Sequence, residues 1–455
     1  MNESWLFIID FILLSFFIII ATVLKTRIPI LRKMIIPTSM IAGFIGLIMG
    51  PEILGWVQFN IERLGDLVYH LMAVGFISLS LKKREVKNSP GILNSGMLIV
   101  STYLIQGIIG FGLFLGMVSL FYPDFFPGIG LLLPLGFGQG PGQAYSIGSQ
   151  WEALGVMGGG NLGLTIAGIG FIWATVIGII LMNFLTRSKK FQQEIPSEKR
   201  NRNQVIEKSE PDEIPLSDAI DKLTYQIALI GLIYLITYVT LIGLEHVLTP
   251  LGTFGETLAQ LLIGFHFLIG SLYAMLFRFL LNKLQHHNIL MEHSPNNFLL
   301  QRISGFSFDY MIAASIAAIS IYALQEYLIP VLILTTIGGL LTALFIIWIT
   351  PRIFPEDPLP NILGFFGMQT GTISTGMALV KSVDPEFKTN TTDNLVMGGA
   401  TAMMFGFPLL LLLNVPVVGY IENQPVMYVY TLLGLCCYFV ILVGLLLYRT
   451  KNKGQ

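Results

Sequence analysis

The sequence has little charge and almost no cysteine. Of its 455 residues, 12% are charged and 54% are hydrophobic, whereas an ordinary soluble domain has about 25% charged residues. This composition is typical of a protein whose solvent is lipid. The formal net charge of −1 leaves no basic excess with which to bind nucleic acid. The two cysteines, Cys436 and Cys437, are adjacent in an apolar segment, which excludes a disulfide framework and a zinc site of the usual spacing.

The sequence also lacks the motifs of the common enzyme classes. It has no Walker-type phosphate loop, no His-Glu-x-x-His metal motif, and no nucleophile beside a plausible base. We therefore expect neither an enzyme nor an ATP-driven pump, and we expect no cofactor.

Eleven stretches are long and apolar enough to cross a bilayer, because a spanning helix needs about 20 mostly apolar residues. The first follows an acidic N-terminus without a cleavage site of small residues, so we expect it to be retained rather than removed as a signal peptide. The sequence thus predicts an all-α polytopic membrane protein. The predicted spans cover residues 5–24, 34–54, 65–81, 91–121, 157–186, 222–247, 258–281, 303–325, 328–350, 392–419 and 426–448.

Two further apolar stretches, 126–150 and 359–381, are interrupted by glycine, proline, glutamine and threonine. Neither is expected to cross the membrane as one continuous helix, so both are predicted to be re-entrant hairpins. The motif Leu-Gly-Phe-Gly-Gln-Gly at 135–140 has a counterpart in Leu-Gly-Phe-Phe-Gly-Met-Gln-Thr-Gly at 363–371. The two hairpins are therefore expected to occupy equivalent places in two halves of the chain.

A polar segment at 187–218 divides the chain, and its mixed charges and three prolines predict a flexible cytoplasmic linker. The halves on either side, 1–186 and 219–419, each have five spans with a hairpin between the fourth and the fifth. Because five is odd, the second half begins on the opposite side of the membrane, which predicts two inverted repeats of the kind found in transporters. Residues 420–455 are predicted to add one extra transmembrane helix and a basic cytoplasmic tail.

The basic residues predict the orientation, because short cytoplasmic loops collect lysine and arginine. If the N-terminus lies outside, only Arg63 of the 26 basic residues is placed outside as well. We therefore expect Lys451 and Lys453 of the C-terminus to lie in the cytoplasm, on the same side as the linker.

The tips of the two predicted hairpins are the candidate binding site. Four glycines and one proline between Gly136 and Gly142 disfavour a helix and allow backbone N–H and C=O groups to face a cavity. Half-helix N-termini that meet there would attract a carboxylate. The alternative is that the glycines serve close helix packing, but two such stretches at equivalent places favour a binding site. The predicted solute-binding residues are Gly138, Gln139, Gly140, Gly142, Gln143, Gly367, Gln369, Thr370 and Gly371.

Oxygen-bearing side chains near the second tip are candidate ligands for a sodium ion, since hard cations prefer oxygen. Asp309 is included because an intramembrane carboxylate is a functional candidate by default, with the alternative that it lies at the membrane boundary beside Arg302. His266 is predicted to be a packing residue rather than a proton relay, and no transition-metal site is expected. The candidate sodium ligands are Thr370, Thr372, Ser374 and Asp309.

In this layout the chain resembles the bacterial glutamate:sodium symporter family over residues 5–419. That family has a glycine-rich signature before its fifth span, and 136–144 reads Gly-Phe-Gly-Gln-Gly-Pro-Gly-Gln-Ala here, with Gln139 near the place of the family's histidine. A glycine-rich second hairpin followed by small residues is matched by 367–378. An Ile-Pro stretch that ends on Ala-Gly, at 36–43, is similar too.

The resemblance implies sodium coupling, a homodimer, an elevator-like movement of the hairpin domain, and a place in a bacterial inner membrane. From it we expect sodium-coupled symport of glutamate or a related small carboxylate. Two alternatives remain open at this stage. One is a proton-coupled transporter of another small anion, and the other is a channel or sensor that binds its solute without transporting it.

Overall fold

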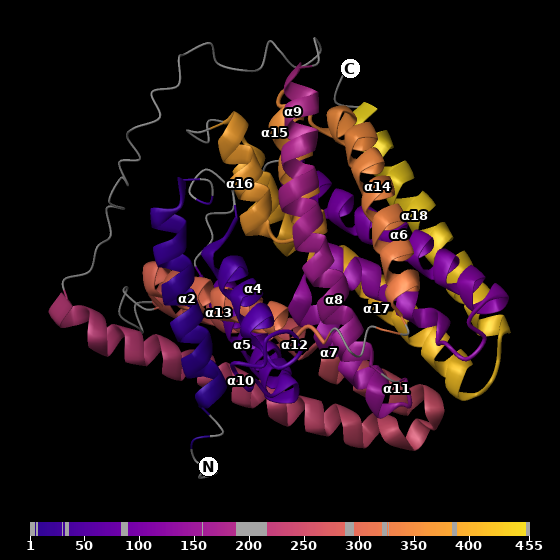
Figure 1. Cartoon of the computed structure of the whole chain (residues 1–455), viewed down its shortest axis with the longest axis horizontal. Helices are drawn as coiled ribbons and strands as arrows, with labels where there is room; N and C mark the ends of the chain where they lie inside the picture. The colour runs from indigo at the N-terminus through magenta and orange to yellow at the C-terminus, as the bar shows by residue number, and fades with distance from the viewer. Residues whose placement is uncertain are drawn as a thin grey trace.

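Every regular element in the described part of the chain is a helix (Figure 1). The computed structural model describes residues 8–29, 36–82, 90–156, 158–187, 216–286, 295–320, 327–384 and 389–451, together with Trp5, Leu31 and Gln325. The predicted linker lies outside the described residues over 188–215, and so does Lys453.

Eight helical spans are long and apolar enough to cross a membrane. One of them is assembled from three consecutive elements, in which a five-residue π-helical turn, η3, joins α8 to α9. The chain is therefore a polytopic helical membrane protein, as its composition predicts. The eight are α2 (Ile9–Arg27), α5 (Ile61–Leu81), α6 (Pro90–Leu120), α8–η3–α9 (Gly159–Ile172, Trp173–Ile177, Gly178–Arg187), α10 (Leu216–Leu248), α14 (Leu328–Ile353), α17 (Thr391–Ile421) and α18 (Val426–Lys451).

Three of the eleven expected spans differ from a single long apolar helix. The stretch 34–54 holds only α4 (Thr38–Met49), which at 12 residues and about 1.5 Å per residue is too short to cross a bilayer. The stretch 258–281 is α11 (Thr253–Gly264) and α12 (His266–His286), bent by 64°. The stretch 303–325 begins within α13 (Asn297–Ala317), whose polar residues lower its hydropathy. The described residues thus support eight spans, or nine with the bent pair, and not eleven.

Both stretches expected to be hairpins are discontinuous in the structure. The first consists of η1 (Pro127–Leu131), the π-helical η2 (Pro134–Gln139) and α7 (Pro141–Ala153). The second consists of α15 (Pro358–Thr370) and α16 (Ile373–Val383), which pack against each other. The breaks fall at glycine and proline because these residues cannot continue a regular helix at low cost.

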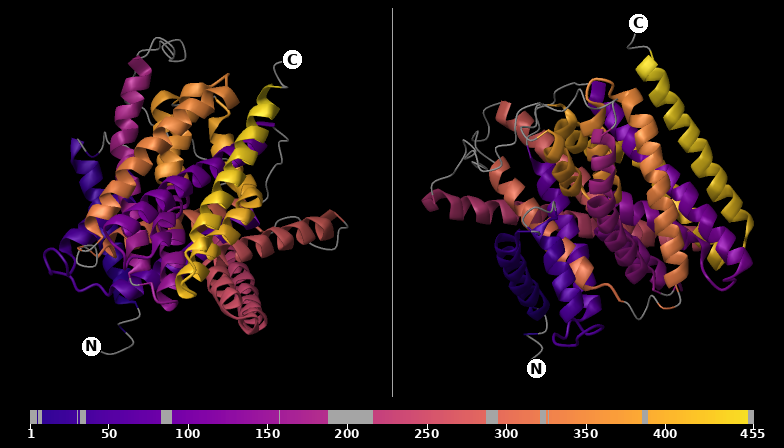
Figure 2. Two further views of the ribbon diagram at one scale, coloured as in Figure 1. Left: turned by 90° about the vertical axis from the view of Figure 1, so that its right-hand side faces the viewer. Right: turned by 45° about the horizontal axis from the view of Figure 1, so that its top comes forward.

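The helices form two groups with the discontinuous segments between them (Figures 1 and 2). In one group α5 packs on α13 and α12, and α4 packs on α13 and α2. In the other group α6 packs on α14, α17 and α18. The interrupted segments η2–α7 and α15–α16 lie with α8 where the two groups approach each other.

The outer surface is apolar, as lipid requires. Large apolar side chains on the long helices are exposed, including Phe184 at 72% and Val440 at 67%. A water-soluble protein rarely exposes contiguous apolar area of this extent. Further exposed apolar side chains include Ile19, Leu235, Val239, Ile329 and Ile441.

One ion pair joins α2 to α5. The Arg63 Nε donates to Asp10 Oδ2 over 2.7 Å, and the Asp10 side chain is only 6% exposed. Arg63 is the one basic residue that the orientation argument places outside, and its partnership with a buried carboxylate gives it a structural reason to be there. Removing the arginine would leave a buried charge unpaired, which is more costly than losing a surface pair.

We predict that Arg63→Met lowers the free energy of unfolding by about 2 kcal/mol. Arg63→Lys, which keeps the charge, should recover part of the loss, and adding Asp10→Asn to Arg63→Met should recover most of it. Thermal unfolding of the purified protein in detergent measures all three. Equal stability of wild type and Arg63→Met would show that the pair contributes nothing.

Candidate functional site

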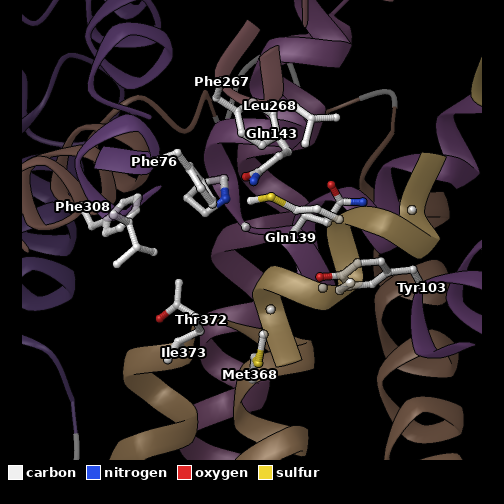
Figure 3. A pocket seen from close by; sticks show the side chains of 18 of the residues that line it. Phe76, Tyr103, Gln139, Gln143, Phe267, Leu268, Phe308, Met368, Thr372 and Ile373 are labelled. Atoms are coloured by element: carbon white, nitrogen blue, oxygen red, sulfur yellow. The ribbon is translucent and has the colours of Figure 1, made fainter. Parts of the chain in front are cut away.

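A cavity of about 220 Å³ lies where the two discontinuous segments meet (Figure 3). Its lining comes from η2 and α7 on one side and from α15 and α16 on the other, and the helices α5, α6, α12, α13 and α17 complete the wall. Pockets for drug-sized ligands have roughly 300–1,000 Å³. A cavity of this size therefore suits a small metabolite.

The two helix breaks touch the cavity from opposite halves of the chain. Gly140 has φ +100°, a backbone conformation that L side chains rarely adopt, and it separates η2 from α7. A Cβ placed on Gly140 would lie 4.0 Å from the carbonyl oxygen of Gly371, which separates α15 from α16. Two glycine-rich tips that are far apart in the sequence are thus neighbours in space.

Each break presents a helix N-terminus to the cavity. The first turns of α7 and α16 line it through Pro141, Ile373 and Ser374. The α7 N-terminus has no side-chain cap, so its first N–H groups have no partner within the helix. The preceding elements end at Gln139, which lines the cavity, and at Thr370, which does not. The site therefore offers partial positive charge from two N-termini, and the backbone of Gln139 and Gly371 lies beside them.

The α16 N-terminus is held by a capping box. The Thr372 N–H donates to Thr375 Oγ1 over 2.9 Å, and the Thr375 N–H donates to Thr372 Oγ1 over 3.5 Å. Thr375 Oγ1 also donates to the carbonyl oxygen of Gly367 over 2.7 Å, which ties α16 back to α15. The capping box starts a new helix directly after the break. Together with the bond to Gly367, it holds the second tip in place.

Two glutamines of the first tip have free amide groups at the cavity. Gln143 is 4% exposed, and Gln139 is half-buried. Both line the cavity, and neither side chain makes a hydrogen bond within the described part of the chain. A buried amide without a partner is costly in a protein interior. The Gln143 amide is therefore a candidate to bind a polar ligand.

A buried bridge connects α6 to the second tip. Gln106 Nε2 donates to the carbonyl oxygen of Gln369 over 2.9 Å and to Thr342 Oγ1 of α14 over 3.1 Å. The Gln369 side chain is fully buried. Its amide makes no hydrogen bond with the described residues, although the Tyr103 hydroxyl lies beside it. Gln106 thus fixes the C-terminal end of α15 against two helices of the bundle.

The far end of α7 is fixed to α8. Glu152 accepts a hydrogen bond from the Gly160 N–H over 2.8 Å. Burial raises the pKa of this carboxyl group, and the hydrogen bond from Gly160 opposes the rise. The C-terminal end of α7 is thus tied to the start of α8.

The remaining wall is mostly apolar, and aromatic side chains make up part of it. Phe76 of α5 contacts Phe267 of α12 and Phe308 of α13, with ring centroids 4.9 Å and 5.4 Å apart. Figure 3 shows Phe76 and Phe308 on one side of the cavity and Tyr103 on the other. Among the described residues that line the cavity there is no Asp, Glu, Lys, Arg or His.

The structure brings seven of the predicted site residues to the cavity and leaves five outside its lining. Gly142 packs near Met72, and Gly367 packs near Gly376. Thr370 is buried and donates to the carbonyl oxygen of Phe366 over 2.8 Å. The residues outside the lining are Gly142, Gly367, Gln369, Thr370 and Asp309. The residues at the cavity are Gly138, Gln139, Gly140, Gln143, Gly371, Thr372 and Ser374.

Asp309 is not at the cavity. It lies on α13 as an exposed side chain, near Ser39 of α4 and within electrostatic range of Lys25 of α2. His266 is buried and stacked on Tyr69, with ring centroids 3.6 Å apart, and its Nε2 lies 3.0 Å from the Tyr69 carbonyl oxygen. This packing agrees with the structural role predicted for the histidine. No group of three His, Cys, Asp or Glu side chains gathers within the described ranges.

Sequence reasoning missed the contribution of α6. Tyr103 and Gln106 are polar residues inside the long apolar stretch 91–121, and they are three positions apart, which places them on one face of a helix. A polar pair on one face of a spanning helix indicates a buried polar contact. This spacing in the sequence could have predicted the polar contact that α6 makes.

Comparisons of the chain with protein-family models, with curated proteins and with solved structures find no match. The resemblance to the glutamate:sodium symporter family stays a prediction. The function is therefore argued from the site.

We predict that Gln106→Met lowers the free energy of unfolding by about 1–3 kcal/mol, because it leaves the Gln369 carbonyl oxygen buried without this donor. Ser101→Ala is the matched control on the same helix, since the Ser101 hydroxyl is buried without a partner. Thermal unfolding of both variants measures the difference. If Ser101→Ala destabilises as much as Gln106→Met, the bridge has no special importance.

Proposed function

We propose that the chain is a secondary active transporter, a sodium-coupled symporter of a small carboxylate, with the solute bound in the cavity. The observation that supports this most is the meeting of two helix breaks at one small cavity inside a helical membrane protein. Broken helices that face a central site are typical of secondary transporters. An irregular backbone at membrane depth is tolerated only where protein or a polar cavity satisfies it.

The helix N-termini favour an anionic solute. The first turns of α7 and α16 both reach the cavity, and partial positive charge at such a terminus stabilises a carboxylate by about 0.3–1 kcal/mol, or up to about 2 kcal/mol when partly buried. The Gln143 amide and the Ser374 hydroxyl add hydrogen-bond donors beside the two termini. A carboxylate is the small anionic group that this set of neutral donors fits.

The proposed sodium ion binds oxygens at the second tip. Gln139 and Gly371, whose backbone carries carbonyl groups, line the cavity, and so do the hydroxyl-bearing residues Thr372 and Ser374. Neutral oxygens of this kind suit a dehydrated hard cation. Asp309 is not included in this ligand set because it lies elsewhere, on the surface of α13.

We further propose that the discontinuous segments are re-entrant hairpins in two inverted repeats. The packing supports this, because exchanging α2 for α10, α4 for α12 and α5 for α13 maps observed helix contacts onto other observed contacts. The proposal includes a homodimer and elevator-like alternating access. It also includes an inner-membrane location with the N-terminus outside and the C-terminus in the cytoplasm.

The test is uptake into proteoliposomes from a panel of labelled amino acids and carboxylates, with and without an inward sodium gradient. We expect accumulation that requires sodium, together with counterflow, in which unlabelled internal solute accelerates entry of the labelled solute. A channel does not show counterflow. Uptake that persists without sodium but follows a proton gradient would overturn the sodium coupling and support the proton-coupled alternative.

Gly140→Ala tests the first helix break. We predict at least a tenfold loss of uptake, because a Cβ at this position is strained at φ +100° and faces the Gly371 carbonyl oxygen across the break. Gly155→Ala is the matched control, since Gly155 has φ +97° and open space around it, away from the cavity lining. Equal losses in the two variants would assign the effect to backbone strain alone.

A further inference from the structure

The chemistry of the cavity wall restricts the solute further than the two helix breaks do. Twenty-eight residues line the cavity, and none of these described residues carries a formal charge at neutral pH. We propose, on the basis of the proposed function, that the solute is a monocarboxylate with an apolar aromatic or branched body. Glutamate and other dicarboxylates are then excluded from the site.

The first argument is the number of charges that the site can accept. The two helix N-termini and the Gln143 amide line the cavity and supply partial positive charge for one carboxylate. Glutamate brings a second carboxylate, which would be buried against a wall without Lys, Arg or His. A buried charge without a partner is strongly disfavoured, so a second carboxylate is expected to weaken binding by about a hundredfold or more.

The second argument is the composition of the wall that the body of the solute would contact. Phe76, Phe267 and Phe308 form one continuous aromatic surface contributed by three helices. Met311 and Met368 extend it, and thioethers adapt to the shape of apolar ligands. Burial of an apolar group against this surface is favourable in proportion to the area removed from water.

The third argument is the relative position of the two surfaces. In Figure 3 the glutamine amides lie above the cavity centre and Thr372 and Ile373 lie below it, while Phe76 and Phe308 occupy one side. A solute whose carboxylate lies between the two helix N-termini would direct its body toward the phenylalanines. The solute therefore needs one polar end and one apolar end, and the cavity volume of about 220 Å³ limits it to a small metabolite.

The solute can carry a 2-amino group or lack one. An ammonium group would be attracted by the backbone carbonyl groups of Gln139 and Gly371, which line the cavity, so an apolar amino acid fits the site. A 2-oxo acid of the same carbon skeleton fits the same wall without that contact. The two share the carboxylate and the apolar body, and separate probes distinguish them.

The experiment combines binding and transport with the full-length protein. The probes are L-leucine, L-phenylalanine, 4-methyl-2-oxopentanoate, L-glutamate and succinate, each with sodium chloride present. Ligand-induced stabilisation of the purified protein measures binding, and sodium-driven uptake into proteoliposomes measures transport. We expect at least one apolar monocarboxylate to bind at least about a hundredfold more tightly than L-glutamate and succinate.

The two proposals fail in different ways. Binding of an apolar monocarboxylate without uptake or counterflow would overturn the transport function and leave the solute class intact. Sodium-driven uptake of L-glutamate or succinate that apolar acids do not inhibit would overturn the solute class and leave transport intact. If none of the probes binds, the solute class is overturned.

A variant pair on one helix tests the aromatic wall. Phe308→Leu should weaken L-phenylalanine binding about tenfold and change L-leucine binding less than threefold, because only the ring contact is lost. Phe306→Leu is the control, since Phe306 is 48% exposed on α13 and does not line the cavity. Equal effects of the two variants on both amino acids would overturn the role of the wall.

Discussion

The structure depends on how the backbone groups of two interrupted helices are satisfied inside an apolar bundle. An unpaired backbone N–H or C=O group costs several kcal/mol in a membrane interior, because no water replaces the lost hydrogen bond. The Thr372 and Thr375 hydroxyls cap one new helix, and the Gln106 amide donates to the Gln369 carbonyl oxygen in the last turn of the helix before it. Where these side chains do not reach, at the start of α7, the backbone opens onto the cavity. At the cavity, backbone groups that lack a partner within the protein are therefore available to a ligand.

Close helix approach supplies the second condition for the site. A Cβ at Gly170 would lie 2.6 Å from the Thr370 carbonyl oxygen, and one at Gly163 would lie 2.4 Å from the Ala144 carbonyl oxygen. The α8–η3–α9 span can therefore pack against both breaks only because it is rich in glycine. In membranes such small-residue contacts replace the hydrophobic driving force that joins helices in water. Glycines at the tips admit polar backbone there, and other glycines on α8 allow this helix to pack closely around it.

The sequence was sufficient to predict the helical membrane class and the places where helices break. Length and apolar composition identified α2, α5, α6, α10, α14, α17 and α18, because long uniformly apolar runs have few alternatives. Gly140 and Gly371 were found because glycine and proline interrupt helices through their own covalent structure. Their meeting at one cavity was expected from the repeat pattern, and the structure places them side by side.

The contacts that depend on tertiary packing could not be predicted in the same way. Hydropathy measures how apolar a stretch is on average and says nothing of its bends. It therefore predicted one span over a stretch in which α11 and α12 are bent relative to each other at Phe265. Asp309 was chosen for its charge, whereas its helix turns it away from the cavity toward Lys25. Gln106 and Tyr103 were missed because their importance comes from the partner that α6 meets and not from their own segment.

The uncharged wall of the cavity determines how ligand binding can depend on pH. Tyr103 is the one titratable side chain among the described lining residues, and a phenol stays protonated at neutral pH. The pocket therefore has a single protonation state across the physiological range. Any change of occupancy with pH must originate in the ionisation of the guest molecule, or in residues outside the pocket such as His266 at the neighbouring bend.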